Sequence, residues 1–254
     1  MKPTAILSVC RQKGIFKTPY KIDRSGSIAL LSVKNRNGAI KKLIKALPCE
    51  NTVIARNCEN EEILINRKKL YEKYNLDTVF PILEVLCRKT AQKFGIRIPF
   101  AEVYIEASPA VACGILAGIQ SMSRIFTVVS AESPLTNSYD ELYFKHGTVI
   151  RHIPGYCNNI TSEAVIIRCD TNYSKFSFDI PVINFTSVRE EKNLTVNVSD
   201  VFVRDEKIDE FLRLWGGYSS IFLYELLGEK PEQNAEVDIN KKADKIFLLD
   251  TDKN

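Results

Sequence analysis

Two loops of this 254-residue chain carry hydroxyl and carboxylate side chains that could bind a polar ligand. One begins at Glu106 and leads through Ser108 into a predicted helix, and the other runs from Ser130 to Ser138. The candidate ligand-binding residues in them are Glu106, Ser108, Ser130, Glu132, Ser133 and Ser138. The hydroxyls could donate hydrogen bonds to a small anionic ligand, and the carboxylates could accept ribose hydroxyls. The simpler alternative is that Ser108 and Ser138 only cap helices and that the second loop is solvated.

The sequence lacks the patterns of familiar catalytic and cofactor sites. It contains neither the G-x-G-x-x-G dinucleotide fingerprint nor the G-x-x-x-x-G-K-S/T phosphate loop nor a G-x-S-x-G elbow. The two histidines, His146 and His152, have no partner at metal-binding spacing. Among the seven cysteines, Cys157 lies in a turn where it could be exposed, whereas Cys113 falls within an apolar helix. The sequence therefore predicts no metal site and no cofactor, and it leaves open whether the protein is an enzyme.

The basic N-terminal segment is a second candidate surface. Residues 1–47 contain eleven Lys or Arg against a single acid, Asp23. Such a segment could contact nucleic-acid phosphates, with Phe16 and Tyr20 available for base stacking. The candidate contacts are Arg11, Lys13, Lys17, Lys41 and Lys42. The alternative is a solvated charged surface, because no named nucleic-acid-binding motif is present.

The two candidate loops follow predicted strands of an α/β core. Residues 100–107, 124–130 and 148–153 are strand-like, and helical patterns over 108–122 and 138–146 separate them. This alternation predicts parallel strands joined by right-handed crossovers. We therefore expect residues 77–170 to form a doubly wound, mostly parallel, Rossmann-like core. In such sheets ligands bind at the carboxyl ends of the strands, which is where both loops lie.

The rest of the chain is predicted to add strands to this core. Residues 1–75 are β-rich, with strands at 4–10, 28–34, 52–56 and 62–65 and a helix over 38–47. Residues 171–228 carry further strands, over 176–183 and 194–203, and helices over 205–214 and 218–227. We expect a single α/β domain over 1–228. Residues 229–254 are predicted to be a charged, disordered tail, although its apolar end, 246–250, could dock on the domain or on a partner.

Composition limits the cellular setting. Hydrophobic residues make up 45% and charged residues 26%, as in soluble globular proteins, and the net charge is +4. No apolar run approaches the about 20 residues of a membrane span. The apolar stretch before Arg11 is too short for a signal peptide, and the cysteines form no C-x-x-C pair. These features predict a cytoplasmic protein without a membrane segment.

Three functions remain open from the sequence. The first is a binding, regulatory or interaction module with an unknown small anionic ligand or protein partner. The second is an enzyme with an unfamiliar site at the carboxyl ends of the core strands, in which Glu132 or Glu106 is the acid or base. The third is nucleic-acid binding through the basic N-terminal segment.

Overall fold

The chain divides into two compact units. They comprise residues 1–72, 210–217 and 244–254, and residues 73–209 and 218–243. The computed structural model describes residues 4–10, 20–25, 28–34, 52–56, 76–156, 160, 162–170, 172, 179–186, 190–191, 194–204, 219–221, 224, 229–233, 235–240 and 246–249. The helix expected over 38–47, the strand over 62–65 and the helix over 205–214 lie outside these residues.

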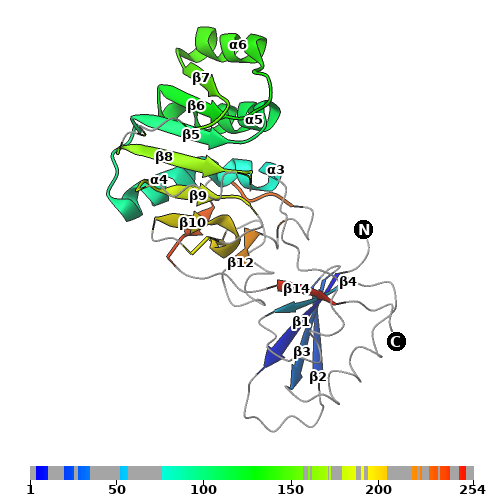
Figure 1. Cartoon of the computed structure of the whole chain (residues 1–254). Coiled ribbons are helices and arrows are strands. Elements are labelled where there is room, and N and C mark those ends of the chain that lie inside the picture. The colour runs from blue at the N-terminus through cyan, green and yellow to red at the C-terminus, as the bar shows by residue number, and fades with distance from the viewer. Residues whose placement is uncertain are drawn as a thin grey trace. The chain divides into compact units, whose positions relative to one another are not determined.

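The first unit contains a five-stranded sheet in the order β14-β4-β1-β3-β2. Its central strands, β1 (Thr4–Cys10), β3 (Ile28–Lys34) and β4 (Thr52–Arg56), pair in parallel. The flanking strands, β2 (Tyr20–Ser25) and β14 (Ile246–Leu249), pair antiparallel with β3 and β4. The segments TAILSVC and IALLSVK of β1 and β3 are mostly apolar, as expected of central strands in a parallel arrangement. Figure 1 shows these strands, and the bounds of the three central ones coincide with strands predicted from the sequence.

The second unit is built on a six-stranded sheet in the order β10-β9-β8-β5-β6-β7, in which every pair is parallel. Its strands are β5 (Glu102–Glu106), β6 (Ile125–Val129), β7 (Val149–Ile153), β8 (Ala164–Arg168), β9 (Val182–Asn184) and β10 (Thr195–Asn197). Its helical segments include α3 (Leu76–Val79), η1 (Phe80–Ile82), α4 (Leu83–Phe94), α5 (Pro109–Ile119), η2 (Gln120–Met122) and α6 (Thr136–His146).

The strand order confirms the predicted Rossmann-like α/β fold. From the β7 edge it reads third, second, first, fourth, fifth and sixth strand in chain order, which is the Rossmann order. The chain therefore leaves β5 toward one edge of the sheet and returns at β8 to build toward the other. The topological switch point lies between β5 and β8, and this is where such sheets bind ligands.

The local sequence explains where the helices end. The helices α4 and α6 each stop at a glycine in the left-handed conformation, Gly95 with φ 69° and Gly147 with φ 66°. Glycine adopts this conformation without the steric penalty of a Cβ atom. The helix α5 begins with Pro109, whose fixed φ suits the first helical position.

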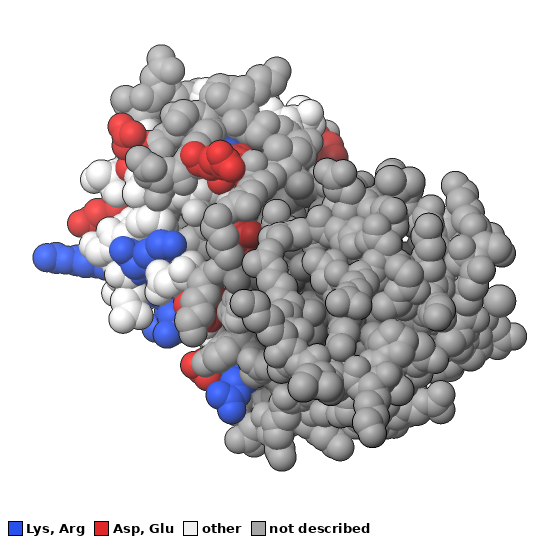
Figure 2. Space-filling model, turned by 90° about the horizontal axis from the view of Figure 1, so that it is seen from below, with Lys and Arg blue, Asp and Glu red and all other residues white. Residues whose placement is uncertain are grey.

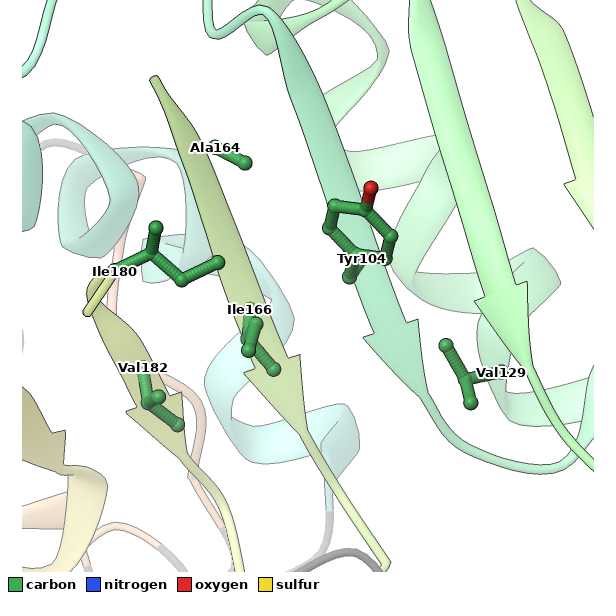
Figure 3. Packing of buried hydrophobic residues seen from close by; sticks show 6 residues of the cluster. All are labelled: Tyr104, Val129, Ala164, Ile166, Ile180 and Val182. Atoms are coloured by element: carbon green, nitrogen blue, oxygen red, sulfur yellow. The ribbon is translucent and has the colours of Figure 1, made fainter. Parts of the chain in front are cut away.

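The two faces of the six-stranded sheet are covered differently. Both α4 and α5 lie behind the strands in Figure 3, whereas the labelled side chains stand in front of them. This front cluster comprises Tyr104, Val129, Ala164, Ile166, Ile180 and Val182. The partly buried Ile153, Tyr156 and Ile160 pack against it. Tyr156, Ile160 and Ile180 belong to connections between strands, so described residues of those connections cover part of the front face.

A small antiparallel sheet completes the second unit. It has the order β12-β11-β13, with β11 (Phe202–Arg204) between β12 (Ser219–Ser220) and β13 (Glu236–Asp238). The predicted strand over 194–203 is thus interrupted by η4 (Val198–Asp200) between β10 and β11. The predicted helix over 218–227 begins instead with β12.

The structure differs from the predicted disordered tail over residues 236–238, and at 246–249 it agrees with the alternative that the apolar end docks on the domain. Residues 236–238 form β13, in which Val237 is buried and pairs with the buried Val203 of β11. Next to β13, the Lys93 ammonium group of α4 donates a hydrogen bond of 3.3 Å to the Ile239 carbonyl. Residues 246–249 form β14. Both strands are short and depend on partners far away in the chain, which is why composition alone indicated disorder.

Candidate functional site

Polar residues end four neighbouring strands of the parallel sheet. They are Asn197 of β10, Asn184 of β9, Arg168 of β8 and Glu106 of β5, and each is paired in register with the next. All four are buried. Residues paired in this way place their side chains on the same face of a sheet. The carboxyl edge therefore carries a continuous buried polar row that crosses the switch point.

A charged network occupies the centre of this row. The Arg168 guanidinium donates through Nε and Nη2 to the two carboxylate oxygens of Glu106, with 3.0 Å between Nη2 and Oε1. Its Nη1 donates to Glu190, and the Tyr156 hydroxyl donates to Glu106. The side chains of Arg168 and Glu106 are both 0% exposed. A bidentate arginine–carboxylate pair of this kind is strong and geometrically specific.

Two asparagines position Glu190. Asn197 accepts a hydrogen bond of 3.0 Å from the Glu190 backbone N–H and donates one of 3.0 Å to the Glu190 carbonyl. Asn184 donates 2.8 Å to the Asn197 side-chain oxygen and accepts from Thr186. Glu190, which lies between β9 and β10, is therefore held against the end of β10 and against Arg168.

Burial and pairing shift the ionisation of this network. Burial raises the pKa of Glu106, while hydrogen bonds and charge from Arg168 act in the opposite direction. Burial would lower the pKa of Arg168, but Glu106 and Glu190 outweigh it and raise the pKa. Burial and the neighbouring Glu106 also raise the pKa of Tyr156. Arg168 therefore stays a cation and Tyr156 stays protonated at neutral pH.

The helix α5 begins beside this network. Ser108 is its N-cap residue, and the Ser108 side chain makes no capping hydrogen bond. The Ser108 carbonyl accepts from the Ala112 N–H at 2.9 Å, which is the first intrahelical bond. The first N–H groups of a helix carry a partial positive charge and favour anions.

All six predicted ligand residues lie at or near the carboxyl edge, but they differ in exposure. Glu106 belongs to the charged network, and Ser130 is buried just after β6, where its hydroxyl accepts from the Glu132 N–H at 3.2 Å. The side chains of Glu132 and Ser133 are exposed. Ser108 and Ser138 are half-buried. Ser138 lies inside α6, whose N-cap is Leu135, so Ser138 is not the capping residue.

Sequence reasoning missed the partners of Glu106. Tyr156 and Arg168 follow Glu106 by 50 and 62 residues, Glu190 follows its partner Arg168 by another 22, and no motif connects them. One local signal was available, because Arg168 ends the otherwise apolar strand AVIIR. A charged residue in line with a fully buried strand must find a partner inside the protein.

Cys87, Cys113 and Cys169 are poor nucleophiles. Burial raises the pKa of Cys87 to about 12 and also raises those of Cys113 and Cys169. These thiols therefore remain protonated at neutral pH, and the thiolate is the reactive form. Cys157 lies outside the described residues. Within the part of the chain that the structure describes, no cluster of three or more His, Cys, Asp or Glu could hold a metal ion.

The predicted nucleic-acid contacts, Arg11, Lys13, Lys17, Lys41 and Lys42, all lie outside the described residues. On the face shown in Figure 2, the Lys and Arg side chains of described residues lie among Asp and Glu side chains. None of the described helices has the length and hydrophobicity to span a membrane. The chain matches no protein-family model, and a search of curated proteins gives no match either.

Proposed function

We propose that the protein is a binding module whose ligand lies over the carboxyl edge of the six-stranded sheet, at the switch point between β5 and β8. One observation carries this proposal: the buried network of Arg168, Glu106 and Glu190 is centred on the strand ends that border the switch point. Ionisable groups with shifted pKa values in such a position are typical of functional sites.

Stability alone gives little reason for this network. Removing a carboxylate or guanidinium from water costs several kcal/mol, about as much as the pairing returns. Apolar side chains of similar size would fill the same space with equal or greater stability. A role in shaping a binding surface is therefore a better explanation, with Arg168 fixing the ends of β5 and β8 from which the surface loops begin.

The groups left to contact a ligand lie above the network. Three of the five N–H groups of Arg168 donate to Glu106 and Glu190, and its side chain is 0% exposed, so it is a poor candidate for direct ligand contact. The start of α5, with the Ser108 hydroxyl, and the exposed Ser133 hydroxyl are the available donors. These groups favour a small anionic ligand, such as a phosphate or carboxylate compound.

Binding is better supported than catalysis. The three described thiols are protonated at neutral pH, and the His152 ring nitrogen Nε2 is engaged by the Ser130 carbonyl at 3.0 Å. Of the acids weighed for catalysis, Glu132 is exposed to solvent and Glu106 is paired with Arg168. A cytoplasmic location is part of the proposal, and the free thiols of Cys87, Cys113 and Cys169 suit a reducing compartment.

A thermal-shift screen of nucleotides, phosphosugars and short oligonucleotides tests the proposal. A ligand at a hundred times its dissociation constant adds about 2.7 kcal/mol of stability, a shift of several degrees. Ser133→Ala and Ser108→Ala should reduce the shift. Ser121→Ala is the matched control, because Ser121 is exposed at the opposite edge of the sheet.

The pattern of shifts separates the candidate functions. A shift that falls in Ser133→Ala but not in Ser121→Ala supports the carboxyl edge as the site. A shift produced only by oligonucleotides and lost in Lys41→Gln with Lys42→Gln would replace the proposal with nucleic-acid binding. If no compound produces a shift, small-ligand binding at this edge is contradicted.

A further inference from the structure

A second polar cluster lies behind the sheet, where α6 packs on β7 and approaches α5. Its members are Cys113 of α5, Ser138 and Tyr139 of α6, and His152 of β7. Arg151, the residue before His152, pairs in register with Thr127 of β6, and Thr127 pairs with Tyr104 of β5. Arg151 therefore lies on the front face with Tyr104. Since side chains alternate along a strand, His152 points to the face that carries the helices.

The cluster contains one hydrogen-bond acceptor and one donor that no described residue uses. His152 Nε2 lies 3.0 Å from the Ser130 carbonyl, which can only accept, so Nε2 is the donor, and in a neutral imidazole Nδ1 then has a free lone pair. Tyr139 is 8% exposed. Neither the Tyr139 hydroxyl nor His152 Nδ1, both buried, has a hydrogen-bond partner among the described residues.

The rings that carry these two groups are neighbours. The ring centroids of Tyr139 and His152 are 6.5 Å apart, with 31° between the ring planes. Cys113 is close enough to add to the effect of burial, which raises the pKa of Tyr139 to about 12. The Ser138 hydroxyl is hydrogen-bonded to the Cys113 thiol. The phenol, thiol and hydroxyl are therefore uncharged at neutral pH.

We propose that the Tyr139 hydroxyl and His152 Nδ1 bind an uncharged hydroxyl or primary amide group of a small molecule. Such a group accepts a hydrogen bond from the phenol and donates one to the imidazole nitrogen, which satisfies both buried atoms at once. A carboxylate or phosphate could accept from Tyr139 but could not donate to Nδ1. A charged group would also be buried without a counter-ion in the cluster. This inference does not rest on the proposed function, which concerns the front face and α5.

Two substitutions remove one unused group each and leave the rest of the cluster. Tyr139→Phe deletes only the hydroxyl. His152→Gln keeps an N–H group that can reach the Ser130 carbonyl but removes the acceptor at Nδ1. Tyr143→Phe is the matched control, because Tyr143 lies on the same helix and is 53% exposed.

Thermal shifts with ribose, glycerol and acetamide, compared with acetate and phosphate, test the site. We expect at least one uncharged probe to raise the melting temperature of the wild type and Tyr143→Phe more than that of Tyr139→Phe and His152→Gln. Nonspecific stabilisation by polyols would affect all four proteins equally. An equal shift in the wild type and Tyr139→Phe would therefore overturn the proposal, as would a larger effect of acetate or phosphate that depends on Tyr139.

A second measurement needs no ligand. Because the Tyr139 hydroxyl makes no hydrogen bond within the described protein, Tyr139→Phe should melt at the wild-type temperature or slightly above it. A melting temperature several degrees lower would show that the hydroxyl already has a partner in the folded protein, and would contradict the site.

Discussion

Replacing Arg168 with methionine would remove the cation at the centre of the buried network and leave a side chain of similar length. The Glu106 carboxylate, 0% exposed, and the Glu190 carboxylate, 5% exposed, would then lose their common counter-charge. Breaking a buried ion pair from one side costs about 3–5 kcal/mol, because an uncompensated charge remains. Domains of ordinary stability have about 5–15 kcal/mol in total, so Arg168→Met should be severely destabilised.

A double-mutant cycle isolates the pair from other effects of the substitution. Glu106→Gln removes one of the two carboxylates that lose their counter-charge in Arg168→Met. Combining the two substitutions should therefore restore part of the lost stability. We expect the double variant to be more stable than the sum of the single variants predicts, by about 1–3 kcal/mol. Urea unfolding followed by circular dichroism, at pH 7 for all four proteins, gives the four free energies.

The deficit of Arg168→Met should also depend on pH. Burial raises the pKa of Glu106, and Arg168 opposes that rise, so the pKa rises further when Arg168 is removed. A carboxyl with a raised folded-state pKa favours the folded state below its unfolded pKa of about 4.3, and this advantage is lost as the pH rises. The free energy of unfolding of Arg168→Met should therefore be closest to that of the wild type near pH 4 to 5 and furthest below it at pH 7. Two results would refute the charged network. One is that the stability losses of Arg168→Met and Glu106→Gln simply add in the double variant, and the other is that the loss in Arg168→Met does not change with pH.

Three further predictions concern packing and ionisation. A Cβ atom at Gly114 would lie 3.0 Å from the Phe80 ring, whereas a Cβ atom at the exposed Gly118 would make only ordinary contacts. In urea unfolding, Gly118→Ala should therefore stabilise the protein by about 0.5–1 kcal/mol, and Gly114→Ala should not. Equal gains in the two variants would contradict this packing. Burial raises the pKa of Cys87 to about 12, so iodoacetamide at pH 8 should not modify this thiol until urea unfolds the protein, as peptide mapping can show. Rapid labelling of Cys87 under native conditions would show that it is not buried. Burial and the hydrogen bond to Glu102 raise the pKa of Tyr104 to about 12. In the ultraviolet difference between wild type and Tyr104→Phe, Tyr104 should therefore titrate above the usual pKa of about 10, and its contribution to stability should be lost as the pH rises past 10. Titration near 10 would contradict the buried hydrogen bond.

Much of the parallel sheet could be predicted from the sequence because its elements have strong local patterns. The strands β5, β6 and β8 are short apolar runs, and α5 is marked by Ser108 and Pro109 at its start. Strand-helix-strand alternation then implies parallel pairing and places the loops after β5 and β6 at one edge. The short strands β11 and β13 were not predictable with their bounds, because three-residue strands are defined by distant partners rather than by their own residues.

The candidate site was predictable only in position. Sequence reasoning placed Glu106 and Ser130 at the carboxyl edge, but nothing local showed that Glu106 pairs with Arg168, which follows it by 62 residues. Nor could sequence show that His152 Nδ1 and the Tyr139 hydroxyl are buried without described partners, because this depends on how α6 packs on β7. Chemistry that arises from tertiary contacts leaves no spacing in the chain to detect.

Hydrogen exchange with mass spectrometry tests the central claim most directly, using the compound that gives the largest shift in the thermal screen. The ligand should slow exchange at the start of α5 and in residues 130–138, and it should leave residues 120–124 at the opposite edge unchanged. Protection confined to the opposite edge or to the first unit, or the absence of any stabilising compound, would contradict a ligand site at the switch point.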